Sequence, residues 1–249
     1  MNKRSHCLGL AVAATLAVGW VGVTAAQTEG RIERIQFAQG ANSTTISGEI
    51  KGYDYVDYRI HASAGQVMEV VLKPANPQNY FNINPPGTDT SMFIGSTTGN
   101  EFKAVLPSDG DYTVRVYLMR AAARRDEVGR YSLSVGVTGQ ALPPVSPTED
   151  ALIRGTPFHA SAPVTCRQLA DQKAGQCEAF VIRRGVDGTG TVEVRWADGG
   201  TRRILFVKGK PVSTDSPDAL SAERRGETSV VKVGAGEQIE IPDALLTGG

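Results

Sequence analysis

Histidine and cysteine are both scarce in this sequence of 249 residues, which contains three of each. The first 26 residues hold one of each, so the rest of the chain keeps His61 and His159 together with Cys166 and Cys177. A Ser–His–Asp triad or a histidine-rich zinc site needs imidazoles that the fold brings together, and two distant histidines support neither. The sequence therefore points to no metal site and no catalytic triad.

Familiar catalytic motifs are absent as well. There is no G-x-S-x-G elbow, no G-x-x-x-x-G-K-[ST] phosphate loop and no H-E-x-x-H helix. The segment from Gly185 to Gly190 looks like a nucleotide-binding loop, but it lies between strand-like segments and supplies no lysine for a phosphate, so we interpret it as a turn. No pair of acids stands out either. We expect a protein that is not an enzyme and that needs no cofactor.

Neither sign of charge dominates, because 26 Lys and Arg residues balance 26 Asp and Glu residues. Together with 41% hydrophobic residues, this balance argues against a disordered tail and against a basic protein that coats nucleic acid. The length permits one large domain or two small ones, each with enough apolar surface for a core.

The N-terminus has the order of a secretory signal peptide. Lys3 and Arg4 precede an apolar run that ends at Ala25 and Ala26, so we expect residues 1–26 to be cleaved before Gln27. A transmembrane anchor is the alternative, but the run is barely long enough to cross a bilayer. We therefore expect a periplasmic or secreted protein with no stable membrane span after cleavage.

The first part of the remaining chain alternates with a period of two. Short runs rich in β-branched and aromatic residues are separated by Gly, Pro, Asn and Asp, which predicts a β-sandwich. The runs are residues 44–50, 55–60, 66–72, 112–117 and 131–137. We place this domain at residues 27–140 and a Pro-rich linker at 141–150.

A small β-rich domain is expected over residues 151–249. Its predicted strands are residues 178–183, 191–196, 201–207, 229–233 and 238–241, with a tight hairpin at Asp198 to Gly200. Cys166 and Cys177 are the two cysteines left after cleavage, and an oxidising compartment lets them form a disulfide. A catalytic or metal-binding thiol is the alternative. The fold class is thus all-β, a sandwich followed by a disulfide-stapled β-rich domain.

Two motifs in the first domain carry a resemblance. The run G-E-I-K-G-Y-D-Y covers residues 48–55, and an R-x-x-x-R spacing at Arg120 and Arg124 follows the strand that contains Tyr112. Over roughly residues 35–138 the chain resembles the periplasmic inhibitors of goose-type (g-type) lysozyme. More broadly, it resembles the pre-peptidase C-terminal β-sandwich.

The resemblance implies a binding protein that blocks the substrate cleft of a muramidase with surface loops. Residue by residue, it places Tyr53, Arg120 and Arg124 at the contact with lysozyme. Asp109 and Gly110, in the loop that corresponds to the family's Ser-Gly-x-Tyr loop, are also expected to bind lysozyme. Arginine binds carboxylates through charge-assisted pairs of hydrogen bonds and tyrosine is a rigid amphipathic anchor, so the set suits an acidic, sugar-binding cleft.

Each of these residues also has a structural interpretation. Tyr112 fits a tyrosine corner, in which the hydroxyl holds a turn of the sandwich. Arg120 and Arg124, with the neighbouring Arg125, fit a solvated face whose charge the acids at 126 and 127 balance, and Tyr53 fits a packing residue at a strand edge.

Two departures from the family stand out. Lysozyme inhibitors commonly show Ser-Gly-x-Tyr, whereas this chain has Asp109-Gly-Asp-Tyr with Ser108 one place earlier. A carboxylate near the catalytic acid of a lysozyme costs free energy through repulsion. The other departure is the additional C-terminal domain. An adhesion module that binds glycan or peptidoglycan is therefore the alternative function.

Overall fold

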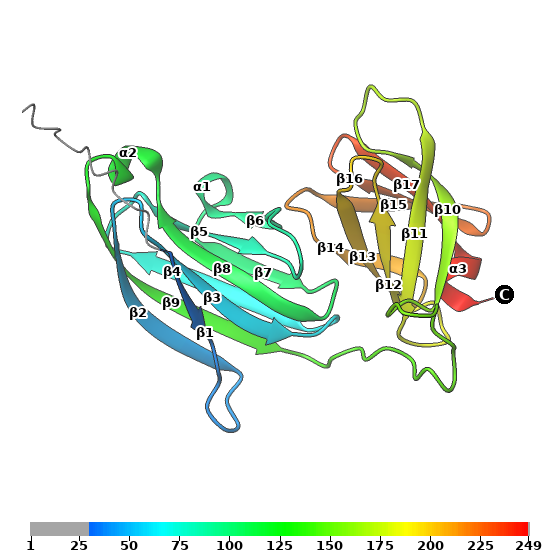
Figure 1. The fold of residues 1–249 in the computed structure, drawn as a ribbon, viewed down its shortest axis with the longest axis horizontal. Coiled ribbons are helices and arrows are strands. Elements are labelled where there is room, and N and C mark those ends of the chain that lie inside the picture. The colour runs from blue at the N-terminus through cyan, green and yellow to red at the C-terminus, as the bar shows by residue number, and fades with distance from the viewer. Residues whose placement is uncertain (1–29, 249) are drawn as a thin grey trace, which may run out of the picture.

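The computed structural model describes residues 30–248. The predicted signal peptide and its cleavage position lie outside these residues. No helix within them is long and apolar enough to cross a membrane. Strands dominate both halves of the chain, as the two-residue periodicity predicted (Figure 1).

The first half is a sandwich of two facing sheets, which we call the sandwich (Figure 1). A five-stranded sheet has the order β1-β3-β8-β5-β6, and a four-stranded sheet has the order β2-β9-β4-β7. The elements are β1 (Gly30–Arg34), β2 (Ser43–Lys51), β3 (Tyr55–Ala62), β4 (Val67–Pro74), β5 (Asn79–Asn84), β6 (Phe93–Ile94), α1 (Gly95–Thr98), β7 (Glu101–Val105), β8 (Gly110–Leu118), α2 (Arg120–Ala123) and β9 (Val128–Thr138). All five strands predicted for this region are present.

Alternation along the strands builds the core of the sandwich. In β3, Val56, Tyr58 and Ile60 are each at most 2% exposed, whereas Arg59 between them is exposed. Each side chain of this size that is buried stabilises the fold by about 1.5–3 kcal/mol. The hydroxyl groups of Tyr58 and Tyr131, which come from facing sheets, lie 2.9 Å apart and form a hydrogen bond inside the core. The core therefore also contains a polar link between the two sheets.

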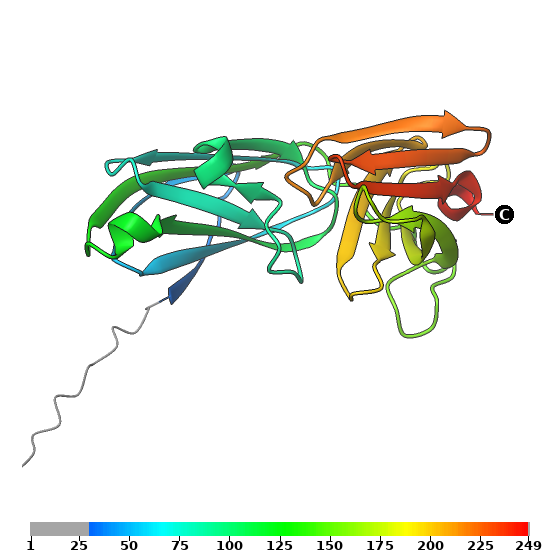
Figure 2. The same cartoon turned by 90° about the horizontal axis from the view of Figure 1, so that it is seen from above.

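The second half is one strongly curved antiparallel sheet of eight strands, which we call the C-terminal sheet (Figure 2). Its order is β14-β13-β12-β11-β10-β17-β16-β15, so the two edge strands are consecutive in the chain. The elements are β10 (Ala160–Arg167), β11 (Gly175–Arg183), β12 (Gly190–Arg195), β13 (Thr201–Val207), β14 (Lys210–Thr214), β15 (Leu220–Arg225), β16 (Thr228–Val233), β17 (Glu237–Pro242) and α3 (Asp243–Thr247). The five strands predicted here are present, and the Gly185–Gly190 segment connects β11 to β12 as a loop.

The C-terminal sheet has a hydrophobic core of its own. It closes around Val181, Val194, Ile204 and Ile239, all fully buried. The predicted disulfide between Cys166 and Cys177 is present and joins β10 to β11. The division of the chain into a domain over 27–140 and another over 151–249 stays a prediction about independent folding.

The Pro-rich segment 141–150 contains no helix or strand, yet both halves hold it by hydrogen bonds. The amide of Leu142 donates to the carbonyl of Ala64 in the sandwich at 2.9 Å, and the amide of Val145 donates to the carbonyl of Arg183 in the C-terminal sheet at 2.8 Å. The segment therefore lies against both halves of the molecule.

Candidate functional site

Two turns meet at one end of the sandwich, which we call the α2 end. The β2–β3 turn contains Gly52 and Tyr53, and the amide of Gly52 donates to the carbonyl of Glu127 at 2.9 Å. Gly52 has a φ of 57°, a left-handed conformation that glycine adopts without strain. Tyr53 beside it is 49% exposed, so about half of its surface is not packed against the sandwich and is available to a partner.

Helix α2 carries the two arginines of the R-x-x-x-R spacing. Ala122 and Ala123 are buried in the sandwich core and fix the helix there. The amide of Arg124 donates to the carbonyl of Arg120 at 3.0 Å, a helical bond that puts residues four apart on the same face. Arg120 and Arg124 are both exposed. The α2 end thus presents two guanidinium groups next to the turn that holds Tyr53.

The nearby acids do not neutralise these arginines. Glu127 pairs with Arg125 at 2.6 Å, and Asp126 pairs with Lys51 at 2.7 Å. A hydrogen bond from Asn76, followed by the one from Arg125, lowers the pKa of the Glu127 carboxyl. Within residues 30–248, Arg120 and Arg124 have no ion pair and no side-chain hydrogen bond. Of the three arginines, only Arg125 therefore fits the alternative interpretation, in which neighbouring acids balance the charge of a solvated face.

Asp109 and Gly110 lie at the opposite end of the sandwich. Strand β8 runs from Gly110 to Leu118, and at about 3.3 Å per residue it separates the two groups by about 26 Å. Gly110 has a φ of 134°, and a Cβ atom there would come within 2.8 Å of Pro86, so this position needs glycine. The structure therefore does not bring all five predicted contact residues together.

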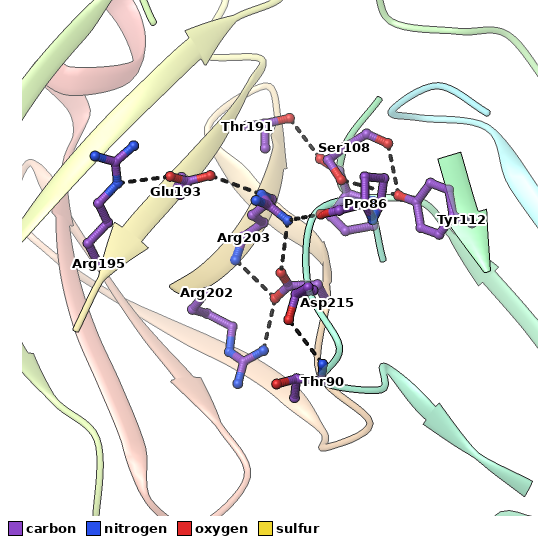
Figure 3. A network of polar contacts seen from close by, with 12 residues as sticks. Pro86, Thr90, Ser108, Tyr112, Thr191, Glu193, Arg195, Arg202, Arg203 and Asp215 are labelled. Atoms are coloured by element: carbon purple, nitrogen blue, oxygen red, sulfur yellow. Dashed lines mark hydrogen bonds and ion pairs between the residues drawn. The ribbon is translucent and has the colours of Figure 1, made fainter. Parts of the chain in front are cut away.

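Tyr112 forms the predicted tyrosine corner beside this loop. Its hydroxyl donates to the carbonyl of Ser108 at 2.8 Å, and the side chain is fully buried (Figure 3). Burial, only partly offset by the bonds to Ser108, raises the pKa of Tyr112 to about 12. The corner fixes the loop that leads into β8.

The C-terminal sheet covers the Asp109 loop. One oxygen of Asp109 accepts from the amide of Ala64 at 2.9 Å, and the other accepts from the guanidinium of Arg184 at 2.7 Å. The Arg184 side chain is completely buried and also donates to the carbonyl of Leu142 and to Thr191. The contact of Asp109 and Gly110 with lysozyme stays a prediction, but in this chain the Asp109 carboxylate joins the two halves.

Further polar contacts extend this junction. Thr191 donates to the carbonyl of Pro107 at 2.8 Å, and Ser213 donates to the carbonyl of Val105. Arg203 donates to the carbonyl of Pro86 at 2.8 Å while Glu193 holds its Nε at 3.0 Å (Figure 3). No sequence pattern predicts this junction, because each partner lies far along the chain and is an ordinary polar residue of a β-rich segment.

Metal-binding clusters do not occur in the described residues: no three His, Cys, Asp or Glu side chains gather in a way that would hold an ion.

Comparison with known proteins identifies relatives for less than half of the chain. No protein-family model matches it. A curated protein from Escherichia coli (strain K12), named an inhibitor of g-type lysozyme, is 30% identical over 111 residues, which are 43% of this chain and 82% of that protein.

Two solved structures are also similar. The crystal structure of a periplasmic inhibitor of g-type lysozyme from Aeromonas hydrophila is 34% identical, covers 45% of this chain and 100% of its own, and has a TM-score of 0.42. A pre-peptidase C-terminal domain of a collagenase from Bacillus anthracis is 15% identical, covers 45% of this chain and 97% of its own, and has a TM-score of 0.28.

Proposed function

Because this chain belongs to the family of g-type lysozyme inhibitors, we propose that it inhibits a g-type lysozyme by seating the α2 end of its sandwich in the substrate cleft. The family consists of inhibitor proteins and not of enzymes. The observation that carries the proposal is the pair of exposed, unpaired guanidinium groups of Arg120 and Arg124 beside the exposed ring of Tyr53.

The chemistry of these three side chains suits a muramidase cleft. Such a cleft holds a catalytic acid and a surface that binds sugars, so a guanidinium group can form two parallel hydrogen bonds with a carboxylate. Because neither Arg120 nor Arg124 has an ion-pair partner among residues 30–248, no such contact has to be displaced within that part of the chain when they bind. Tyr53 adds contact area at a low cost in side-chain entropy.

The proposed location is the periplasm. The N-terminal segment has the order of a signal peptide, and the disulfide between Cys166 and Cys177 requires an oxidising compartment. The similar inhibitor from Aeromonas hydrophila is described as periplasmic. The inhibitor would then meet a host or competitor lysozyme where that enzyme attacks peptidoglycan.

The test replaces Arg120 and Arg124 together with alanine. Charge-assisted hydrogen bonds contribute about 1.5–3 kcal/mol each, so we expect inhibition of g-type lysozyme to weaken at least tenfold in a peptidoglycan turbidity assay. The melting temperature should hardly change, because neither side chain has a partner in the described part of the chain. Arg→Lys at both positions should show a clear deficit too, since lysine lacks the planar fork.

The control is Arg125→Ala, which removes an equal charge from the same end but from a residue already paired with Glu127. Its effect on inhibition should stay below about 1 kcal/mol. Equal inhibition by the wild type and by the Arg120→Ala, Arg124→Ala variant would refute the placement of the cleft contact at the α2 end. Inhibition that extends to other lysozyme types would contradict the proposed target.

A further inference from the structure

We propose that a hollow beside the disulfide of the C-terminal sheet binds a carboxylate-bearing amino-sugar glycan of the kind that forms peptidoglycan. We call this hollow the disulfide groove. Its walls include Arg167, Gln168, Leu169, Lys173, Gln176 and Trp196. The inference goes beyond lysozyme inhibition and does not depend on it.

The groove has the size and the rigidity of a binding site. Its volume is about 590 Å³, within the range of about 300–1,000 Å³ that small-ligand sites occupy. Cys166 and Cys177 are among the residues that line it, and their disulfide fixes the end of β10 against the start of β11. Trp196 lines the groove and is also part of the hydrophobic core, at 7% exposure, so packing holds its ring in place.

The groove carries more positive than negative charge. Arg167 and Lys173 have no ion pair and no side-chain hydrogen bond anywhere in residues 30–248. Asp198 is the one acid among the residues that line the groove, and it accepts hydrogen bonds from the amide of Gly200 at 2.9 Å and from Gln168 at 3.2 Å. An anionic ligand would therefore enter a site with two available cations.

Arg167 also contains a buried donor without an acceptor. Its Nε atom is shielded from solvent and has no hydrogen-bond partner. Nearly all buried polar atoms in folded proteins are paired, so such an atom needs an explanation. A carboxylate bound by the guanidinium group would supply the missing acceptor once the Arg167 side chain turns its Nε toward the groove, because carboxylates accept two hydrogen bonds side by side.

The remaining walls favour an amino sugar over a simple anion. Gln168 and Gln176 offer amide groups that both donate and accept hydrogen bonds, as hydroxyl and acetamido groups require. The side chain of Leu169, which is 54% exposed, offers apolar surface to the C–H faces of a sugar, and the small accessible part of the Trp196 ring adds to it. Carboxylate, acetamido and apolar groups occur together in an N-acetylated sugar that carries an acid side chain.

The position of the groove leaves the α2 end available. Helix α2 and the loop between β10 and β11 lie in different halves of the molecule, with the junction at Asp109 and Arg184 between them (Figure 1). One molecule can therefore hold glycan with its C-terminal sheet while the sandwich binds lysozyme. Binding through two linked sites raises the effective concentration of the inhibitor at the surface that lysozyme attacks.

Calorimetric titration of the full-length mature protein tests the proposal without any lysozyme. The probe is the disaccharide of N-acetylglucosamine and N-acetylmuramic acid, and di-N-acetylchitobiose is the matched sugar without the acid group. We expect the first to bind at least tenfold more tightly than the second. The Arg167→Gln, Lys173→Gln variant should lose at least tenfold in affinity for the first sugar and keep its melting temperature.

The control variant is Arg154→Gln, Lys210→Gln, which removes the same two charge types from exposed positions outside the groove. It should bind like the wild type. Absence of binding, equal affinity for the two sugars, an equal loss in the control, or equally tight binding of inorganic phosphate would each overturn the proposal. These titrations contain no lysozyme, so a negative result would not count against the proposed inhibition. A negative inhibition assay would likewise not count against glycan binding by the disulfide groove.

Discussion

Tyr112 illustrates how a single hydroxyl group can support a loop. Its ring is fully buried in the sandwich core, and its hydroxyl is the donor that satisfies the carbonyl of Ser108. The loop held in this way leads directly to Asp109, which bonds to the other half of the molecule. Tyr112 is therefore a core residue that also positions the junction, because it holds the loop that contains Asp109.

Replacing Tyr112 with phenylalanine should lower the free energy of unfolding by about 1–3 kcal/mol at neutral pH, because the buried carbonyl of Ser108 loses its donor. Urea denaturation measures this loss. Tyr53→Phe is the matched control and should have almost no effect, since that residue is half exposed and its hydroxyl has no hydrogen bond within residues 30–248.

The same residue makes stability depend on alkaline pH. The pKa of a tyrosine is about 10 in an unfolded chain, and burial raises that of Tyr112 to about 12. Its stabilising contribution is therefore complete below about pH 10 and is lost as the pH rises toward 12. Tyr112→Phe should show a smaller decline in stability between pH 10 and 12 than the wild type. An identical decline would contradict this assignment.

Strands that the sequence did not predict lie mostly at sheet edges. Five of the seven missed strands are edge strands, namely β1, β6, β7, β14 and β15, whereas β5 and β10 are interior and the edge strand β2 was predicted. An edge strand has one neighbour and is less buried, so its side chains need not alternate between apolar and polar. Strand β15 is the extreme case, with four charged or small exposed residues at Ala222–Arg225. The central strands β8 and β12 alternate between apolar and polar residues, and this periodicity identified them.

The disulfide between Cys166 and Cys177 joins β10 to β11 and is expected to stabilise the C-terminal sheet. Cys166 and Cys177 are 11 positions apart, and closing a loop of this length stabilises a protein by about 3 kcal/mol through the entropy of the unfolded chain. Cys166→Ala, Cys177→Ala should lose about that much in urea denaturation. Purified from the periplasm, the wild type should contain no free thiol. Two free thiols, or an unchanged free energy of unfolding, would show that the bond does not form in the cell.

Across the whole molecule, the sequence could place single residues but not their distant partners. The resemblance to lysozyme inhibitors identified Tyr53, Arg120 and Arg124, and the structure puts all three at the α2 end. It could not show that Arg184, 75 positions beyond Asp109, is the partner of that carboxylate. Such pairs depend on how the two halves are docked, and a local sequence pattern contains no information about docking.

Asp109→Asn should loosen this docking without reducing inhibition. It leaves the completely buried guanidinium of Arg184 without its carboxylate. Removing one partner of a fully buried ion pair lowers the free energy of unfolding by about 3–5 kcal/mol. Asp109 is about one third exposed, so we expect a loss of at most about 3 kcal/mol here. Small-angle scattering should show a larger radius of gyration.

Asp111→Asn is the control for that experiment. Its carboxylate lies two residues further along and pairs with Arg34 and His61 on the surface, so the scattering profile should not change. If Asp109→Asn instead abolished inhibition while the scattering profile stayed the same, then Asp109 would contact lysozyme, as the resemblance to the family first implied.

The attachment of the Pro-rich segment to both halves has a consequence for the lifetime of the protein. A protease must draw several residues of chain into its active site in extended form, and it cuts most readily at mobile, exposed loops. Here the amides of Leu142 and Val145 are held by opposite halves of the molecule, so cleavage between these two residues first requires at least one of the two hydrogen bonds to break. The attachment of the segment to both halves therefore slows degradation that begins between Leu142 and Val145 and helps the two halves stay together in one molecule.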